Sequence, residues 1–116
     1  MKKQIEIQKE NVKTLLDLIR DNPDLRVLPM VDEEVVASDE FSSWAASFGN
    51  AEIDYTWNDG ERIYFKSSDE EQLVEKEIDK LSYHGKRWER LVEEEAEMNI
   101  KNLAWEKVIA VWIGLP

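Results

Sequence analysis

The sequence contains no cysteine, a single histidine, four glycines and three prolines in 116 residues. Without cysteine there is neither a disulfide framework nor a thiolate for catalysis. The one histidine, His84, cannot form a usual zinc site, which needs several His or Cys ligands. The sequence also gives no support for His84 as the general base of a serine nucleophile. The four glycines stand apart, so there is no glycine-rich phosphate loop. These absences predict a protein that is not an enzyme and that needs no metal and no cofactor.

Long apolar runs are also missing, and the 15 basic residues are outnumbered by 26 acidic ones. No stretch reaches the roughly 18–20 apolar residues that span a bilayer, and the charged first residues lack the apolar segment of a signal peptide. We therefore expect a cytoplasmic protein with no membrane partner. A small basic cluster, Lys86, Arg87 and Arg90, is diluted by neighbouring acids, which argues against direct binding of nucleic acid.

Negative charge is the feature that the sequence has in excess. The net charge is −11, and residues 21–61 hold eleven acidic side chains against one basic side chain, Arg26. Such a segment repels nucleic acid and attracts basic protein surfaces. An acidic surface can also serve solubility alone, and this alternative stays open.

The hydrophobic pattern predicts an α+β fold in a single domain over residues 1–116. Residues 8–21 predict an N-terminal helix with one apolar stripe, made of Val12, Leu15, Leu16 and Ile19. Ile5 and Ile7 alternate with charges, which fits either a short strand or a first helical turn. Residues 25–31 predict a strand that lies at a sheet edge or carries a bulge, because Pro29 cannot donate to a ladder. Residues 108–113 are apolar on both faces and predict a strand buried inside the sheet.

Residues 42–66 predict an antiparallel meander. Gly49-Asn50 is typical of a two-residue hairpin turn, and Gly60 of the left-handed position in a three-residue turn that would pair Tyr55 with Ile63. One face is then expected to be buried: Trp44, Ala46, Phe48, Ile53, Tyr55, Trp57, Ile63 and Phe65. The opposite face, which includes Glu52, Asp54 and Tyr64, is expected to face solvent.

Two helices are predicted within residues 68–101, packed on one face of this antiparallel sheet. Ser68 and Glu71 have the spacing of a capping box, and Gly85 is a natural terminator. The second helix places Glu93, Glu94 and Glu97 on the side away from its apolar residues.

Acidic side chains on the open meander face and in the loops beside the edge strand are the candidate partner-binding residues. Carboxylates held on a rigid sheet present a fixed negative pattern, much as DNA presents phosphates, so such a surface can mimic DNA in another protein's groove. Tyr64, between Arg62 and Lys66, is the candidate anchor. The candidate set is Glu52, Asp54, Tyr64, Asp32, Glu33, Glu34, Asp39 and Glu40.

Several segments resemble small, acidic, uncharacterised proteins encoded by phages and prophages of Firmicutes. They are LRVLPMVD at 25–32, VVA at 35–37, SW at 43–44, SFG at 47–49, ERIYF at 61–65 and VIAVWI at 108–113. The resemblance implies a phage protein that acts in a bacterial cytoplasm, with anti-CRISPR inhibitors as an analogy.

Two functions follow from the charge and the resemblance. The first is a phage-type interaction protein that binds and inhibits or modulates a host protein with a basic surface, such as a CRISPR effector. The alternative is a self-associating structural or accessory phage protein without inhibitory activity, in which aromatic side chains outside the core form the interface.

Overall fold

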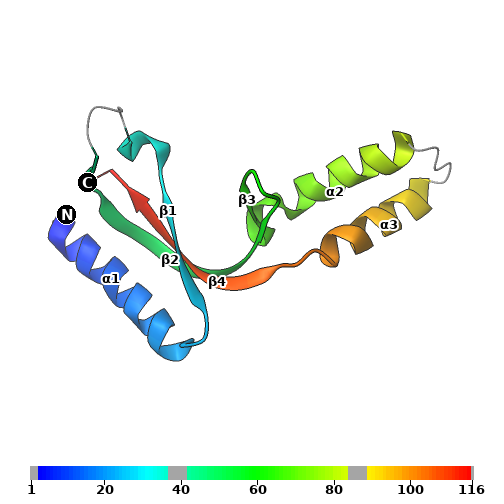
Figure 1. Cartoon of the computed structure of the whole chain (residues 1–116). Coiled ribbons are helices and arrows are strands. Elements are labelled where there is room, and N and C mark those ends of the chain that lie inside the picture. The colour runs from blue at the N-terminus through cyan, green and yellow to red at the C-terminus, as the bar shows by residue number, and fades with distance from the viewer. Residues whose placement is uncertain (1–2, 37–41, 84–88, 116) are drawn as a thin grey trace. The chain divides into compact units, whose positions relative to one another are not determined.

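The computed structural model describes residues 3–36, 42–83 and 89–115, which form an α+β arrangement of three helices and a four-stranded mixed sheet (Figure 1). The helices are α1 (Gln4–Asp21), α2 (Lys66–Tyr83) and α3 (Glu89–Lys101), with a short 3-10 helix, η1 (Glu33–Val35). The strands are β1 (Arg26–Val31), β2 (Ser47–Asn58), β3 (Ile63–Phe65) and β4 (Glu106–Gly114), in the order β1-β4-β2-β3.

Packing divides the chain into two compact units, which are described separately. The first unit comprises Met1–Asp54 with Lys107–Pro116, and the second comprises Tyr55–Glu106.

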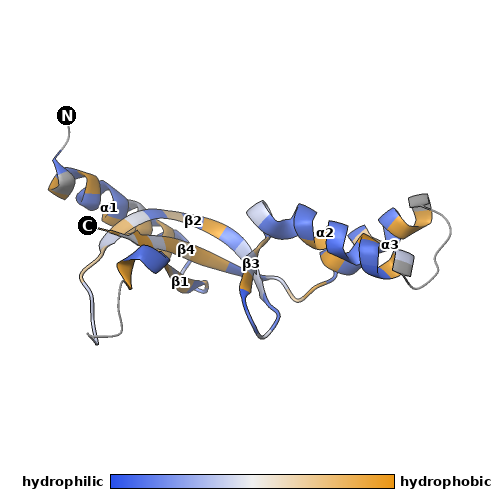
Figure 2. Ribbon diagram, turned by 90° about the horizontal axis from the view of Figure 1, so that it is seen from above, coloured by the Kyte–Doolittle hydropathy of each residue, from blue (hydrophilic) through white to orange (hydrophobic). Residues whose placement is uncertain are grey.

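Strand β4 is the centre of the first unit. Its neighbours in the sheet are β1 and β2, and Val108, Ile109, Ala110 and Val111 are all buried. This confirms the prediction of a strand buried inside the sheet, and β4 is accordingly a largely apolar ribbon in Figure 2. The fully antiparallel sheet was a wrong prediction, because β1 and β4 run parallel, from Arg26 opposite Val108 to Val31 opposite Ile113. Their long connection carries η1, β2, β3, α2 and α3, which supplies the crossover that parallel neighbours need.

Strand β1 lies at an edge of the sheet, which is one of the two arrangements that Pro29 predicted. The Asp32 N–H donates to the Ile113 carbonyl oxygen at 2.8 Å. Because alternate residues of a parallel strand face the same neighbour, the N–H groups of Leu28 and Met30 also face β4. The backbone nitrogen of Pro29 therefore points away from β4, toward the open edge of the sheet. Its missing hydrogen breaks no hydrogen bond between the strands.

Helix α1 begins at Gln4, so Ile5 and Ile7 belong to helical turns rather than to a strand. The predicted apolar stripe is only partly correct. Val12 and Leu15 are half-buried, whereas Leu16 and Ile19 are exposed. The side that is partly covered also includes Asn11, whose amide donates to the Phe48 carbonyl oxygen of β2 at 2.9 Å.

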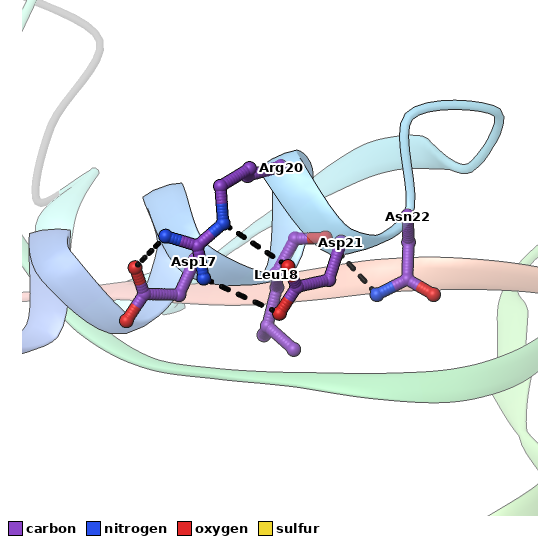
Figure 3. Close-up of polar contacts among 5 residues, drawn as sticks. All are labelled: Asp17, Leu18, Arg20, Asp21 and Asn22. Atoms are coloured by element: carbon purple, nitrogen blue, oxygen red, sulfur yellow. Dashed lines mark hydrogen bonds and ion pairs between the residues drawn. The ribbon is translucent and has the colours of Figure 1, made fainter.

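The C-terminal end of α1 is closed by local polar contacts (Figure 3). Both the backbone N–H and the side-chain amide of Asn22 donate to the Leu18 carbonyl oxygen, at 2.9 and 3.0 Å. Arg20 lies 3.0 Å from Asp21 and 3.4 Å from Asp17. The helix therefore ends one residue before Asn22-Pro23, as the sequence predicted.

The predicted turn at Gly49-Asn50 is wrong, because both residues lie inside the twelve-residue strand β2. A Cβ atom built on Gly49 would lie 2.8 Å from the carbonyl oxygen of Trp112 in β4. Glycine is therefore needed here for the close approach of two strands and not for a turn. Trp44, which the meander had placed in a strand, precedes β2.

The second predicted turn exists, but its register differs. Asn58 pairs with Ile63 and Thr56 with Phe65, which leaves a four-residue loop. Gly60 has the predicted positive φ, 98°. The Asn58 side chain accepts from the Gly60 N–H at 2.7 Å, and the Asp59 carboxylate accepts from the N–H groups of Glu61 and Arg62 at 2.8 and 2.9 Å. These side-chain oxygens provide hydrogen-bond acceptors for the backbone N–H groups of the four-residue loop.

The register shift is an odd number of residues, so it changes which residues of β2 and β3 share a face: Thr56 lies beside Phe65, and Trp57 lies beside Tyr64. Phe48, Ile53 and Tyr55, all expected in the core, are exposed, whereas Asp54 and Thr56 are buried. The predicted buried face was therefore wrong for most of β2, although Phe65 is buried as expected.

In the second unit, α2 packs against α3 and against β3. The core holds Tyr64, Leu73 and Ile100, with four partly buried neighbours: Trp57, Val74, Leu103 and Trp105. Val92 and Ala96 of α3 are buried, whereas Leu91 is exposed. That the helices also cover a face of the remaining sheet stays a prediction.

The predicted capping box at Ser68 and Glu71 is wrong, because α2 begins at Lys66. Asp69 caps the start of the helix instead. Its carboxylate accepts a hydrogen bond from the backbone N–H of Phe65, the residue before α2, at 2.7 Å. The same carboxylate lies 3.7 Å from the Arg62 guanidinium.

Candidate functional site

The candidate acids at 32–34 form one exposed group at the end of β1. Asp32 precedes η1, and its carboxylate accepts from the Glu34 N–H at 3.0 Å. Asp32, Glu33 and Glu34 are all exposed. The turn holds its backbone through Asp32, so these three carboxylates project from an ordered segment. We call this group the η1 acids.

The other candidate acids divide into three cases. Glu52 is exposed on β2, as predicted. Asp54 is 6% exposed, so the prediction that it faces solvent is wrong. Its burial follows from β2, where the buried positions change from odd to even numbers between Ala51 and Asp54. Asp39 and Glu40 lie outside the described residues.

Tyr64 is not the surface anchor that the sequence predicted, because it is only 7% exposed. Its ring stacks on Trp57 with centroids 5.5 Å apart, and the Arg62 guanidinium lies 4.2 Å from the ring centroid. These contacts place Tyr64 in the core of the second unit and assign it a structural role. The basic neighbours that suggested an anchor instead cover aromatic rings, since Lys66 lies over Tyr55 at 5.6 Å.

Tyr64 and Asp59 influence each other's ionisation. Hydrogen bonds from the backbone N–H groups of Arg62 and Glu61 hold the pKa of Asp59 below its ordinary value. Burial raises the pKa of Tyr64, and hydrogen bonding to Asp59 raises it further. This arrangement stabilises the loop between β2 and β3.

Next to the η1 acids, the ends of three strands form an apolar hollow of about 300 Å³. Met30 of β1 lies opposite Trp112 of β4, and Gly49 of β2 lies against the backbone of Trp112. The lining residues are Met30, Val31, Asp32, Gly49, Trp112, Ile113 and Gly114. Trp112 is 38% exposed. We call this feature the Trp112 hollow.

Sequence reasoning missed the Trp112 hollow because residues 108–113 were predicted as buried throughout. A glycine inside an alternating strand pattern often marks a close backbone approach. Gly49 carried that signal, but the neighbouring Asn50 made a turn the favoured interpretation.

Two further hollows have linings that indicate no particular ligand. One, of about 610 Å³, lies between the start of α1 and the Ser47-Phe48-Gly49 end of β2. The other, of about 590 Å³, lies where α2 begins beside α3, and its lining mixes Lys66 and Lys101 with Glu70, Glu71 and Glu97. Within the described residues, no group of three or more His, Cys, Asp or Glu side chains is placed to hold a metal ion.

None of the described helices is long and apolar enough to cross a membrane. No family model, curated protein or solved structure matches the chain.

Proposed function

We propose that this chain is a small acidic interaction protein of the phage type, which binds a basic surface of a host protein and inhibits or modulates it. The observation that supports the proposal most is the group of exposed η1 acids beside the Trp112 hollow. Acidic groups alone steer a basic partner but hold it weakly. An apolar hollow beside them adds the desolvated contact that most stable interfaces contain.

The η1 acids suit this role because their backbone is held before any partner arrives. The Asp32 side chain bonds to the Glu34 N–H, and the Asp32 N–H bonds to β4. Ordered groups lose less entropy on binding than mobile ones. Glu52 adds a further exposed carboxylate in the same unit.

The host target in this proposal is a nucleic-acid-binding defence factor, such as a CRISPR effector, whose phosphate-binding groove attracts the acidic surface. The net charge of −11 and the resemblance to phage proteins support this choice. Activity would take place in the bacterial cytoplasm, without cofactor and without direct contact to nucleic acid.

The test begins with capture of partners from a bacterial lysate on the tagged chain, and then measures association of the purified pair at increasing salt. We expect association to slow as salt rises, because screening weakens electrostatic steering. The triple variant D32K/E33K/E34K should associate about 10-fold more slowly or worse. The control E93K/E97K reverses two exposed acids of α3 and should associate at nearly the normal rate.

The proposal also predicts that the captured partner loses nucleic-acid binding in the presence of the chain, and keeps it with D32K/E33K/E34K. If E93K/E97K abolished the effect and the η1 variant did not, the binding surface would lie on α3. If salt strengthened the complex and neither variant changed it, the electrostatic mechanism would be wrong.

Self-association remains the second candidate, because Tyr55 and Trp112 are partly exposed aromatics. Two copies of so acidic a chain repel each other, so this association should strengthen with salt. Sedimentation velocity at low and high salt separates the two functions. A monomer at all salt concentrations would contradict the alternative.

A further inference from the structure

The Trp112 hollow is a row of residues across three strands. Met30 and Trp112 are register partners in the parallel pair, and Gly49 lies against the Trp112 backbone. A Cβ atom on Gly49 would lie 2.8 Å from the Trp112 carbonyl oxygen, so the two strand backbones approach closely at this position. Gly114, at the same end of β4, also lines the hollow, and a Cβ atom there would meet nothing within 4 Å. The hollow is thus open at Gly114.

The hollow has the size and polarity of a site for one apolar side chain. Its volume of about 300 Å³ lies at the lower end of the range of roughly 300–1,000 Å³ typical of small-molecule pockets. Val31, at its edge, is 52% exposed although it is a large aliphatic residue. An apolar group placed here would remove Val31 and Trp112 from water, which is favourable.

The charges beside the hollow restrict the occupant further. Asp32 belongs to its lining, and Glu33 and Glu34 follow directly in η1. None of the described residues that line the hollow is basic. An occupant with acidic flanks would meet like charges, whereas one with Lys or Arg beside its apolar group would meet three carboxylates. A second copy of this chain fits poorly, because its net charge is also −11.

We propose that the Trp112 hollow binds one apolar side chain of a basic protein segment, while flanking Lys or Arg residues of that segment pair with the η1 acids. This inference rests on the proposed function, and it names the kind of partner segment that the surface accepts. Binding then uses two separable contributions, one apolar and one electrostatic.

Three seven-residue peptides separate these contributions. The first has a central Leu flanked by three Lys on each side, the second replaces Leu by Ser, and the third replaces all Lys by Glu. Each is titrated into the ¹⁵N-labelled full chain, and amide and Trp indole peaks are followed by NMR. With the first peptide, we expect shifts at Val31, Asp32, Gly49 and Trp112. The Ser peptide should bind about three- to tenfold more weakly, and the Glu peptide should cause no shift.

A pair of matched protein variants tests the same hollow from the other side. Val31 and Val36 are 52% and 51% exposed, but only Val31 lines the hollow. Val31→Ser should weaken binding of the Leu peptide and remove its advantage over the Ser peptide. Val36→Ser should leave both affinities within about twofold of the original chain, since substitutions away from a contact usually have small effects.

The outcomes distinguish this inference from the proposed function. If the Leu and Ser peptides bind equally well while salt weakens both, the hollow proposal is overturned and the acidic surface stands. If the Glu peptide binds as well as the Lys peptide, the electrostatic basis of both proposals is overturned. If no peptide shifts the peaks around Trp112, the hollow does not accept such a segment.

Discussion

Gly49 lies so close to Trp112 that a Cβ atom on the glycine would come within 2.8 Å of the tryptophan carbonyl oxygen. The atom that such a Cβ would meet belongs to the backbone of β4, which cannot move aside as a flexible side chain could. Glycine at position 49 thus allows β2 and β4 to lie this close together beside the Trp112 hollow.

Gly49→Ala should lower the free energy of unfolding by about 1–3 kcal/mol, the usual cost of forcing extra atoms into a packed site. Urea unfolding followed by circular dichroism measures this change. Gly114→Ala is the matched control, because a Cβ atom there would meet nothing within 4 Å. Equal stability of the two variants would show that the strands separate easily at Gly49.

Pro29→Val should increase self-association through the edge of β1. Position 29 faces away from the sheet, so valine would restore an outward N–H in the middle of the edge strand. An edge with a full row of donors and acceptors pairs readily with another chain. Size-exclusion chromatography with light scattering should show a monomer for the original chain and larger species for the variant at high concentration and high salt.

A control for this prediction is Pro23→Val, since Pro23 precedes β1 and belongs to the turn after α1. It should remain monomeric under the same conditions. If Pro29→Val behaves in the same way, charge repulsion alone keeps this edge from pairing.

Asp59 and Tyr64 should contribute to stability at opposite ends of the pH scale. Asp59 has a lowered pKa in the folded chain, so its contribution is present above its unfolded pKa of about 3.9 and is lost as pH falls through the folded value. Tyr64 has a raised pKa, so its contribution is present below about pH 10 and is lost as pH rises through the folded value.

Asp59→Asn keeps a side-chain oxygen for the loop N–H groups and removes the charge. The stability difference between the original chain and this variant should shrink from pH 7 to pH 3, because only the original chain loses a charged acceptor. In an ultraviolet titration, the pKa of Tyr64 should fall in the variant but stay above its ordinary value, since burial is its first cause. An unchanged Tyr64 titration would show that Asp59 does not influence the phenol.

Addition of a chelator should leave the melting temperature unchanged. A metal ion that bound only the folded chain would stabilise it by mass action, and its removal would lower the melting temperature. Thermal unfolding with and without EDTA measures the effect. A drop of several degrees would contradict the prediction that the chain needs no metal.

Several elements were predictable because their signals are local. Residues 108–113 are apolar without alternation, and β4 is indeed buried inside the sheet. Pro29 predicted an edge position or a bulge, because its nitrogen carries no hydrogen to donate, and β1 lies at an edge. Gly60 takes a positive φ because the loop itself demands it. Each of these inferences needed only one residue or one short run.

The remaining features depend on partners far away in the sequence. The parallel pairing of β1 with β4 joins residues more than seventy positions apart, and no local pattern distinguishes it from an antiparallel arrangement. Gly49 is needed because Trp112 lies close to it, and Trp112 is far away in the sequence. The neighbouring residues alone therefore favoured the interpretation of a turn. The β2–β3 register depends on loop acceptors at Asn58 and Asp59, and a different loop length was equally consistent with the pattern.

The candidate surface was predicted in part for the same reasons. The η1 acids are exposed, since consecutive charged residues beside an edge strand have little to pack against. Asp54 is buried because the buried positions of β2 change from odd to even numbers before it, and Tyr64 is buried beside its register partner Trp57 in the core of the second unit. A reversal of Asp54 to Lys would therefore disturb folding and could not serve as a test of binding.

The chain order also sets an order of folding. Residues 55–106 are continuous in sequence, so the second unit can form as soon as they have left the ribosome. The first unit needs β1 and β4 together, and β4 follows β1, β2 and β3 in the sequence. Until β4 is made, β1 lacks its partner strand, and the Trp112 hollow does not exist. A partner that binds this hollow can therefore engage only a chain whose synthesis has passed residue 114.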